Sequence, residues 1–248
     1  MKRAGILAAL AAALCAVPAA AMTVQPVVLD LKTAGQAMSQ IITVENSFTT
    51  PLPVEMRVQA LDYEADGLKA KADQKEADEL LVFPPQALIQ PGQTQSFRVQ
   101  FVGDPGLAKS KHFYVTVAQL PVKLPANQSA IQILYNFQVL VSVAPQGAVP
   151  ALKVDSAAIG KDGNGKPVPL LTLSDPSNAH AYLSAGRLRV SASDAAGKEV
   201  YRRTFSGPEI QQTVGFGLVG AGQTRKLTIP AELPPTATRV DAQFTPDK

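Results

Sequence analysis

Two stretches of the chain alternate strictly between apolar and polar side chains, and this pattern constrains the fold more than any other feature. Residues 54–60 read VEMRVQA, and residues 96–101 read SFRVQF. Since successive side chains of a β-strand point to opposite faces, a period of two predicts strands with one buried and one wet face. Similar runs occur at 23–31, 40–45, 80–83, 112–119 and 130–143.

Turn residues separate these runs and indicate the fold class. Pro84-Pro85 and Pro91-Gly92 stand between consecutive runs, where proline and glycine favour turns. About seven or eight strands in roughly 120 residues is the number expected for an immunoglobulin-like sandwich. The charged stretch 64–79 lacks the alternation, and we interpret it as a solvated connection or a short helix.

The pattern restarts after residue 144, which predicts a second domain. Pro145 and Gly147 are typical of an interdomain elbow, and about a hundred residues remain for another sandwich. We expect its strands at 151–155, 168–173, 187–193, 199–204, 226–229 and 240–244. The predicted fold is therefore all-β, with one immunoglobulin-like domain over 22–145 and a second over 146–248.

The first residues have the features of a secretory signal peptide. Lys2 and Arg3 precede an apolar run over 4–17, and residues 18–21 end in the small-residue pattern that signal peptidase cleaves. We expect cleavage after Ala21 and export to the periplasm, with no membrane insertion. A lipoprotein site at Cys15 is disfavoured by Leu14, because such a site needs a small residue there. Cleavage would remove the chain's single cysteine.

Composition and motifs do not favour an enzyme or a nucleic-acid-binding protein. Only 17% of residues are charged and the net charge is +3, so a basic face for nucleic acid is not expected. Residues 215–220 match the dinucleotide-binding spacing G-x-G-x-x-G, but another turn follows at once, which favours a glycine-rich loop. His112 and His180 have no metal-ligating neighbours in sequence. We therefore expect no cofactor and no metal, although a hydrolase built from scattered residues stays open.

Residues 130–143 are unusual because the run is longer than an ordinary strand. Every odd position from 131 to 143 is apolar. One interpretation is a long, bent core strand that leads into the elbow. The other is a strand that completes another protein's sheet, with backbone hydrogen bonds supplying affinity and alternate side chains filling pockets.

An ordered set of short motifs resembles the periplasmic pilus-assembly chaperones of the PapD/FimC type. The set comprises Phe83-Pro84-Pro85, the stretch LIQPG at 88–92, the stretch FRV at 97–99, the stretch HFYV at 112–115, a variable loop, the alternating strand and Pro145. The resemblance covers about residues 24 to 145. It implies a boomerang of two immunoglobulin-like domains that lends a strand to a fimbrial subunit and delivers the subunit to an outer-membrane usher.

The resemblance also implies which residues bind the subunit. Ile131, Ile133, Tyr135 and Phe137 fall at the positions of the donor side chains, and residues 139–143 are expected in the chaperone's own core. The uncovered strand could also drive weak self-association of the free protein. The alternative is an exported adhesive or structural sandwich protein that self-associates or binds glycans.

One position departs from the family pattern. Its members hold the subunit's terminal carboxylate with an arginine of the first strand and a lysine of the donor strand, whereas this sequence has Val27-Val28 and Leu140 there. Lys32 and Arg98 are the candidates for a replacement anchor. Without any such cation, a charge-assisted contact of defined geometry would be lost.

Overall fold

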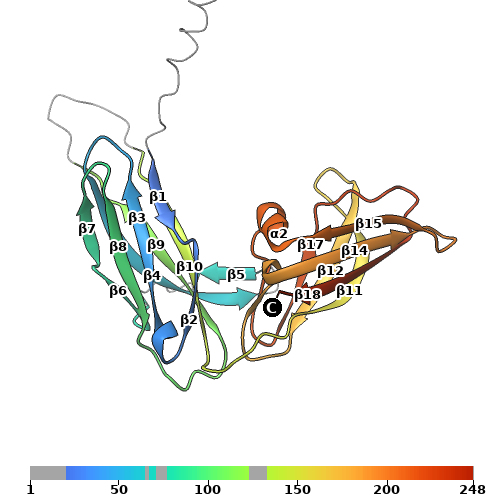
Figure 1. Ribbon diagram of the computed structural model, residues 1–248, viewed down its shortest axis with the longest axis horizontal. Coiled ribbons are helices and arrows are strands. Elements are labelled where there is room, and N and C mark those ends of the chain that lie inside the picture. Colours follow the sequence, from blue (N-terminus) through green and yellow to red (C-terminus); the bar gives the residue numbers. More distant parts are fainter. Residues whose placement is uncertain (1–20, 65–66, 71–76, 123–132, 248) are drawn as a thin grey trace, which may run out of the picture.

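The computed structural model describes residues 21–64, 67–70, 77–122 and 133–247. Two bodies of β-strands lie at an angle to each other (Figure 1), and each has its own apolar core, one drawn from residues 22–143 and one from residues 171–240. This confirms the predicted fold class. The expected signal peptide lies outside the described residues, apart from Ala21.

The first body is a sandwich of two sheets. One has the order β1-β3-β8-β6 and the other the order β2-β10-β9-β4-β5, with β7 also paired to β4. The strands are β1 (Met22–Gln25), β2 (Val28–Lys32), β3 (Ser39–Asn46), β4 (Leu52–Glu64), β5 (Gly67–Ala70), β6 (Leu80–Phe83), β7 (Gln86–Ile89), β8 (Thr94–Phe101), β9 (Lys111–Gln119) and β10 (Asn136–Ala144); a 3-10 turn, η1 (Gln36–Met38), precedes β3.

The alternating residues pack between these two sheets as the sequence predicts. Phe97, Val99 and Phe101 of β8 are fully or almost fully buried, while Arg98 between them is exposed. Because each buried aliphatic or aromatic side chain contributes about 1.5–3 kcal/mol, this shared core accounts for much of the domain's stability.

The first predicted strand, 23–31, is in fact two strands in different sheets. β1 pairs with β3, whereas β2 pairs in parallel with β10. Pro26 stands between them and has no N–H to donate to a ladder, so the chain leaves one sheet and enters the other here. Periodicity does not reveal such a change of partner.

The stretch 64–79 also differs from expectation. Strand β4 continues to Glu64 and turns back as β5, so a β-hairpin replaces part of the predicted connection or helix. Figure 1 shows this hairpin reaching out of the first sandwich toward the second body. The outer end of the hairpin therefore lies close to the junction between the domains.

The second body contains the six predicted strands and several elements that the pattern did not indicate. Its sheets are β11-β12-β17, β15-β14-β18 and the short ribbon β13-β16. The elements are β11 (Lys153–Lys161), β12 (Pro167–Asp175), β13 (Ala181–Tyr182), η2 (Leu183–Ala185), β14 (Gly186–Ser193), β15 (Glu199–Phe205), α2 (Gly207–Val214), β16 (Leu218–Val219), β17 (Gln223–Thr228) and β18 (Arg239–Pro246). Residues 162–166 form the turn between β11 and β12, with φ of 81° at Gly165.

Helix α2 has a clear local cause. Ser206 and Glu209 form a capping box, in which the Glu209 carboxylate accepts from the Ser206 N–H at 2.8 Å, and Pro208 occupies the first turn. The glycine string at 215–220 follows this helix and contains β16, and the next element is strand β17, not a helix. That order lacks the strand-glycine-helix arrangement that holds a dinucleotide.

The two bodies are joined by the segment between β10 and β11, residues 145–152. The predicted boundary at 145 falls within this segment and stays a prediction. None of the described helices is long and apolar enough to cross a bilayer.

Candidate functional site

Strand β10 has an open edge over its first half. On one side, residues 136–143 pair antiparallel with β9. On the other side, pairing with β2 begins only at Leu140, and within the described residues no strand pairs with 136–139 on that side. The edge is open because β1, the strand that precedes β2 in the chain, belongs to the other sheet.

The backbone groups that face this edge can be assigned from two hydrogen bonds. Gln119 N–H donates to the Tyr135 carbonyl at 3.0 Å, so odd residues of the segment pair with β9. Leu140 N–H donates to the Val27 carbonyl at 3.0 Å, so even residues point the other way. In an antiparallel ladder this alternation places the N–H and C=O of Asn136 and Gln138 on the open edge.

The side chains of the odd positions change from exposed to buried along the strand. Ile133 is 70% exposed, Tyr135 43% and Phe137 36%, whereas Val139 and Val141 are fully buried. The Tyr135 ring lies 6.1 Å from the ring of Phe48, which packs on the edge of the core. The exposed row is therefore an outward continuation of the core.

The predicted donor strand is only partly within the described residues. There, β10 begins at Asn136, and residues 133–135 are not assigned to a strand, although the Tyr135 carbonyl accepts a hydrogen bond from β9. Ile131 lies outside the described residues. Ile133, Tyr135 and Phe137 are brought together at the open edge, and the predicted core role of 139–143 agrees with their burial.

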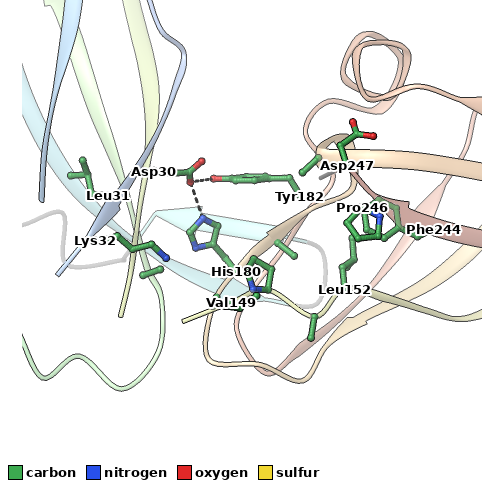
Figure 2. Close-up of a pocket in the computed structure, with 16 residues that line it drawn as sticks. Asp30, Leu31, Lys32, Val149, Leu152, His180, Tyr182, Phe244, Pro246 and Asp247 are labelled. Atoms are coloured by element: carbon green, nitrogen blue, oxygen red, sulfur yellow. Dashed lines mark hydrogen bonds and ion pairs between the residues drawn. The ribbon is translucent and has the colours of Figure 1, made fainter. Parts of the chain in front are cut away.

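A cavity of about 500 Å³ lies between the domains, where β10 ends at Ala144 (Figure 2). Val149, Leu152 and Phe244 supply apolar walls, and Lys32 supplies a cation. The Lys32 Nζ donates to the Ala148 carbonyl at 3.2 Å, which leaves its other protons available. Lys32 therefore places an ammonium group at the interdomain cavity.

Arg98 lies elsewhere. Its side chain projects from the outer face of the β1-β3-β8-β6 sheet, where it lines a separate hollow with Ile41 and Gln100. The structure therefore does not bring the two candidate anchor residues together, and Arg98 does not line the interdomain cavity.

A chain of hydrogen bonds connects the domains on one wall of the cavity (Figure 2). His180 Nε2 lies 2.8 Å from Asp30 Oδ1, and Tyr182 Oη donates to the same oxygen at 2.9 Å. The Tyr182 hydroxyl also lies 3.1 Å from Ser142 Oγ, which is 2.9 Å from His112 Nδ1. Asp30, Ser142 and His112 belong to the first domain, so the chain crosses the junction.

Burial shifts the pKa of two members of this cluster, His112 and Tyr182. It lowers the pKa of His112 to about 3, with the neighbouring His180 acting in the same direction and Asp30 opposing. Burial likewise raises the pKa of Tyr182, so its hydroxyl keeps its proton and can donate to Asp30. Among the described residues, no group forms a hydrogen bond with the buried His112 Nε2, which is consistent with a neutral ring.

Sequence reasoning missed this cluster. The sequence shows only that His112 and His180 lack metal-ligating neighbours, whereas in the structure the centroids of their rings lie 5.4 Å apart and both residues are buried. The residues that contact one another come from segments 30 to 152 positions apart. No local spacing reports such contacts. No metal-binding group of three His, Cys, Asp or Glu residues occurs in the described part of the chain.

Residues 21–148 match the family model described as the pili and flagellar-assembly chaperone, PapD N-terminal domain. No curated protein sequence matches the chain. The matched residues include the whole first sandwich and the open edge of β10.

Solved structures have the same fold at low sequence identity. The YadV chaperone is 13% identical, with a TM-score of 0.52, covering 90% of this chain and 91% of its own. The CsuC–CsuE chaperone–tip adhesion subunit pre-assembly complex of Acinetobacter baumannii has 14% identity and a TM-score of 0.51, and the match covers 91% of this chain and 98% of that chain. The Salmonella enterica SafA pilin in complex with the SafB chaperone has 14% identity and a TM-score of 0.50, and the match covers 93% of this chain and 99% of that chain.

Proposed function

Because the chain belongs to the pili and flagellar-assembly chaperone family, we propose that it binds a pilus subunit through the open edge of β10. The family consists of assembly chaperones, which catalyse no reaction. Two observations carry the proposal: no described strand pairs with the outward backbone groups of Asn136 and Gln138, and the side chains of Ile133, Tyr135 and Phe137 form an exposed row.

Donor-strand complementation follows from this geometry. A subunit that lacks a strand has its own open edge and an uncovered apolar groove. Pairing with β10 would satisfy both backbone edges, and the exposed side chains of Ile133, Tyr135 and Phe137, together with Ile131 as the sequence predicts, would fill the groove. Until a subunit binds, the same edge is open to weak self-association, because unpaired strand edges are templates for pairing.

The proposed partners are a pilus subunit and an outer-membrane usher. Two structural neighbours are complexes of a chaperone with a tip adhesion subunit and with a pilin, and they support a subunit partner. The expected signal peptide supports a periplasmic location. Delivery to an usher is proposed from the family resemblance.

We propose Lys32 as the anchor for the subunit's terminal carboxylate. Its ammonium group faces the interdomain cavity, and the nearby Asp30 carboxylate already accepts from His180 and Tyr182. An ammonium group that retains free protons in a largely apolar cavity suits a carboxylate ligand. Arg98, on the outer face, has no part in this proposal.

The test is capture of a subunit encoded beside the chaperone. Ile133→Asp with Tyr135→Asp should lower subunit affinity by at least about 30-fold, because charged groups would enter an apolar groove at contacts worth ~2 kcal/mol or more. Leu81→Asp is the matched control, since Leu81 is 55% exposed on the outer face of the same domain. Equal capture by all three proteins would refute the donor-strand proposal.

A further inference from the structure

The ribbon formed by β13 and β16 lies at the junction of the two domains. Ala181 pairs with Val219 and Tyr182 with Leu218, so two short segments far apart in sequence form one unit. The segments that flank it hold His180 on one strand and the glycine-rich string on the other. Both strands of the ribbon contact the first domain.

The β13 strand is held by β2, β10 and the loop before β9. Ser110 N–H donates to the Asn178 carbonyl at 3.1 Å, and His180 N–H donates to Ser110 Oγ at 3.0 Å. His180 Nδ1 lies 2.9 Å from the same hydroxyl, and its Nε2 reaches Asp30. If Nε2 carries the proton, Nδ1 accepts from Ser110, and every one of these contacts is satisfied.

The β16 strand is held by the hairpin β4–β5. Tyr63, near the end of β4, donates from its hydroxyl to the Leu218 carbonyl at 3.4 Å. Its ring lies so close to Gly220 that a Cβ at that glycine would stand 2.9 Å from two ring carbons. A Cβ at Gly222 would stand 3.1 Å from Lys109 Nζ. The glycine string therefore permits close approach of the hairpin.

Contacts on both strands of the ribbon restrict the angle between the two domains more than the linker at 145–152 can alone. Domains joined by a linker are expected to move relative to each other unless their interface prevents it. In the linker, Gln146 N–H donates a hydrogen bond to Thr33 Oγ1 at 3.2 Å, and Gly147 has a φ of 75°. The ribbon adds the Asp30–His180–Tyr182 contacts on one side and the Tyr63–Gly220 contact on the other.

We infer that the β13–β16 ribbon locks the two domains at one angle, with His180, Tyr182 and Gly220 as positioning residues. The glycine string 215–220 then serves interdomain packing. If the proposed subunit-binding function is correct, the locked angle also fixes the cavity with Lys32 relative to the open edge of β10. The angle itself does not depend on that function.

Two substitutions separate locking from general stability. Gly220→Ala introduces a methyl group against the Tyr63 ring and should force the hairpin away from the ribbon. Gly163→Ala is the matched control, because a Cβ at Gly163 meets nothing within 4 Å. Tyr182→Phe removes the hydroxyl that contacts Asp30 and Ser142 while keeping the ring, and it serves where Gly220→Ala fails to fold.

The readout is the distance distribution between nitroxide labels on Ser96→Cys and Thr204→Cys, one exposed site in each domain, measured by pulsed electron paramagnetic resonance. The exported chain would carry no other cysteine once Cys15 is removed. We expect one narrow peak for the parent and for Gly163→Ala, and a broadened or shifted distribution for Gly220→Ala and Tyr182→Phe.

A narrow, unshifted peak in folded Gly220→Ala and Tyr182→Phe would overturn the inference, even if both variants unfold at lower denaturant concentration. Subunit capture by the same proteins separates the two proposals. Broadened peaks with undiminished capture would support the lock and show that subunit binding does not need the fixed angle. Unchanged peaks would overturn the lock and leave the donor-strand proposal intact.

Discussion

At the scale of single residues, His112 makes stability depend on pH. Its pKa is about 3 in the folded protein, against an ordinary value of 6.5, because burial disfavours the charged ring. Between those two values the unfolded chain binds a proton that the folded protein does not. Stability is therefore greatest above pH 6.5 and decreases as the pH falls toward 3.

We expect the free energy of unfolding to fall by about 2 kcal/mol from pH 7 to pH 5 through His112. His112→Asn removes the titrating group and should flatten this part of the pH dependence, whatever its effect on absolute stability. Urea unfolding of the parent and the variant at both pH values provides the measurement. An identical loss in both proteins would mean that His112 does not cause it.

Lys32 is the residue whose substitution tests the anchor. Lys32→Met keeps most of the apolar stem and removes the charge, so subunit affinity should fall about tenfold, as expected for one hydrogen bond to a charged group. Arg98→Met should leave affinity unchanged, because Arg98 lies outside the cavity. Calorimetric titration distinguishes them. A loss with Arg98→Met and none with Lys32→Met would reverse the assignment.

At the scale of elements, alternation predicted the existence of strands well and their partners poorly. The runs at 80–83 and 96–101 became β6 and β8, because alternating side chains must bury one face in either sheet. The run at 23–31 was divided at Pro26 between two sheets. An alternation of period two is the same in both sheets, so it could not predict this division. The division is nevertheless what leaves the edge of β10 open.

Other elements were missed for different reasons. The hairpin β4–β5 carries charged residues because its outer part lies beyond the core, so its sequence resembles a loop. Helix α2 did have a local signal, since Ser206 and Glu209 have capping-box spacing, but the helix has only eight residues. The ribbon β13–β16 has two residues in each strand and is defined by its packing between domains rather than by its own sequence.

At the scale of the whole molecule, the candidate site was half predictable. The row Ile133, Tyr135 and Phe137 was found because it is local and periodic, and the structure gives it a partly exposed position. The cavity, the Asp30–His180–Tyr182 contacts and the Tyr63–Gly220 contact were not, because they exist only where the domains meet. The two-domain structure therefore combines the open edge of β10 with an interdomain cavity that contains Lys32.

The central claim concerns the backbone of β10, and amide hydrogen exchange in the chaperone–subunit complex tests it most directly. In the free protein, the amide of Phe137 should be protected by its pairing with β9, while those of Asn136 and Gln138 exchange rapidly at the open edge. On subunit binding, the amides of Asn136 and Gln138 should become strongly protected. A stable complex in which both amides still exchange as fast as in the free protein would contradict donor-strand pairing.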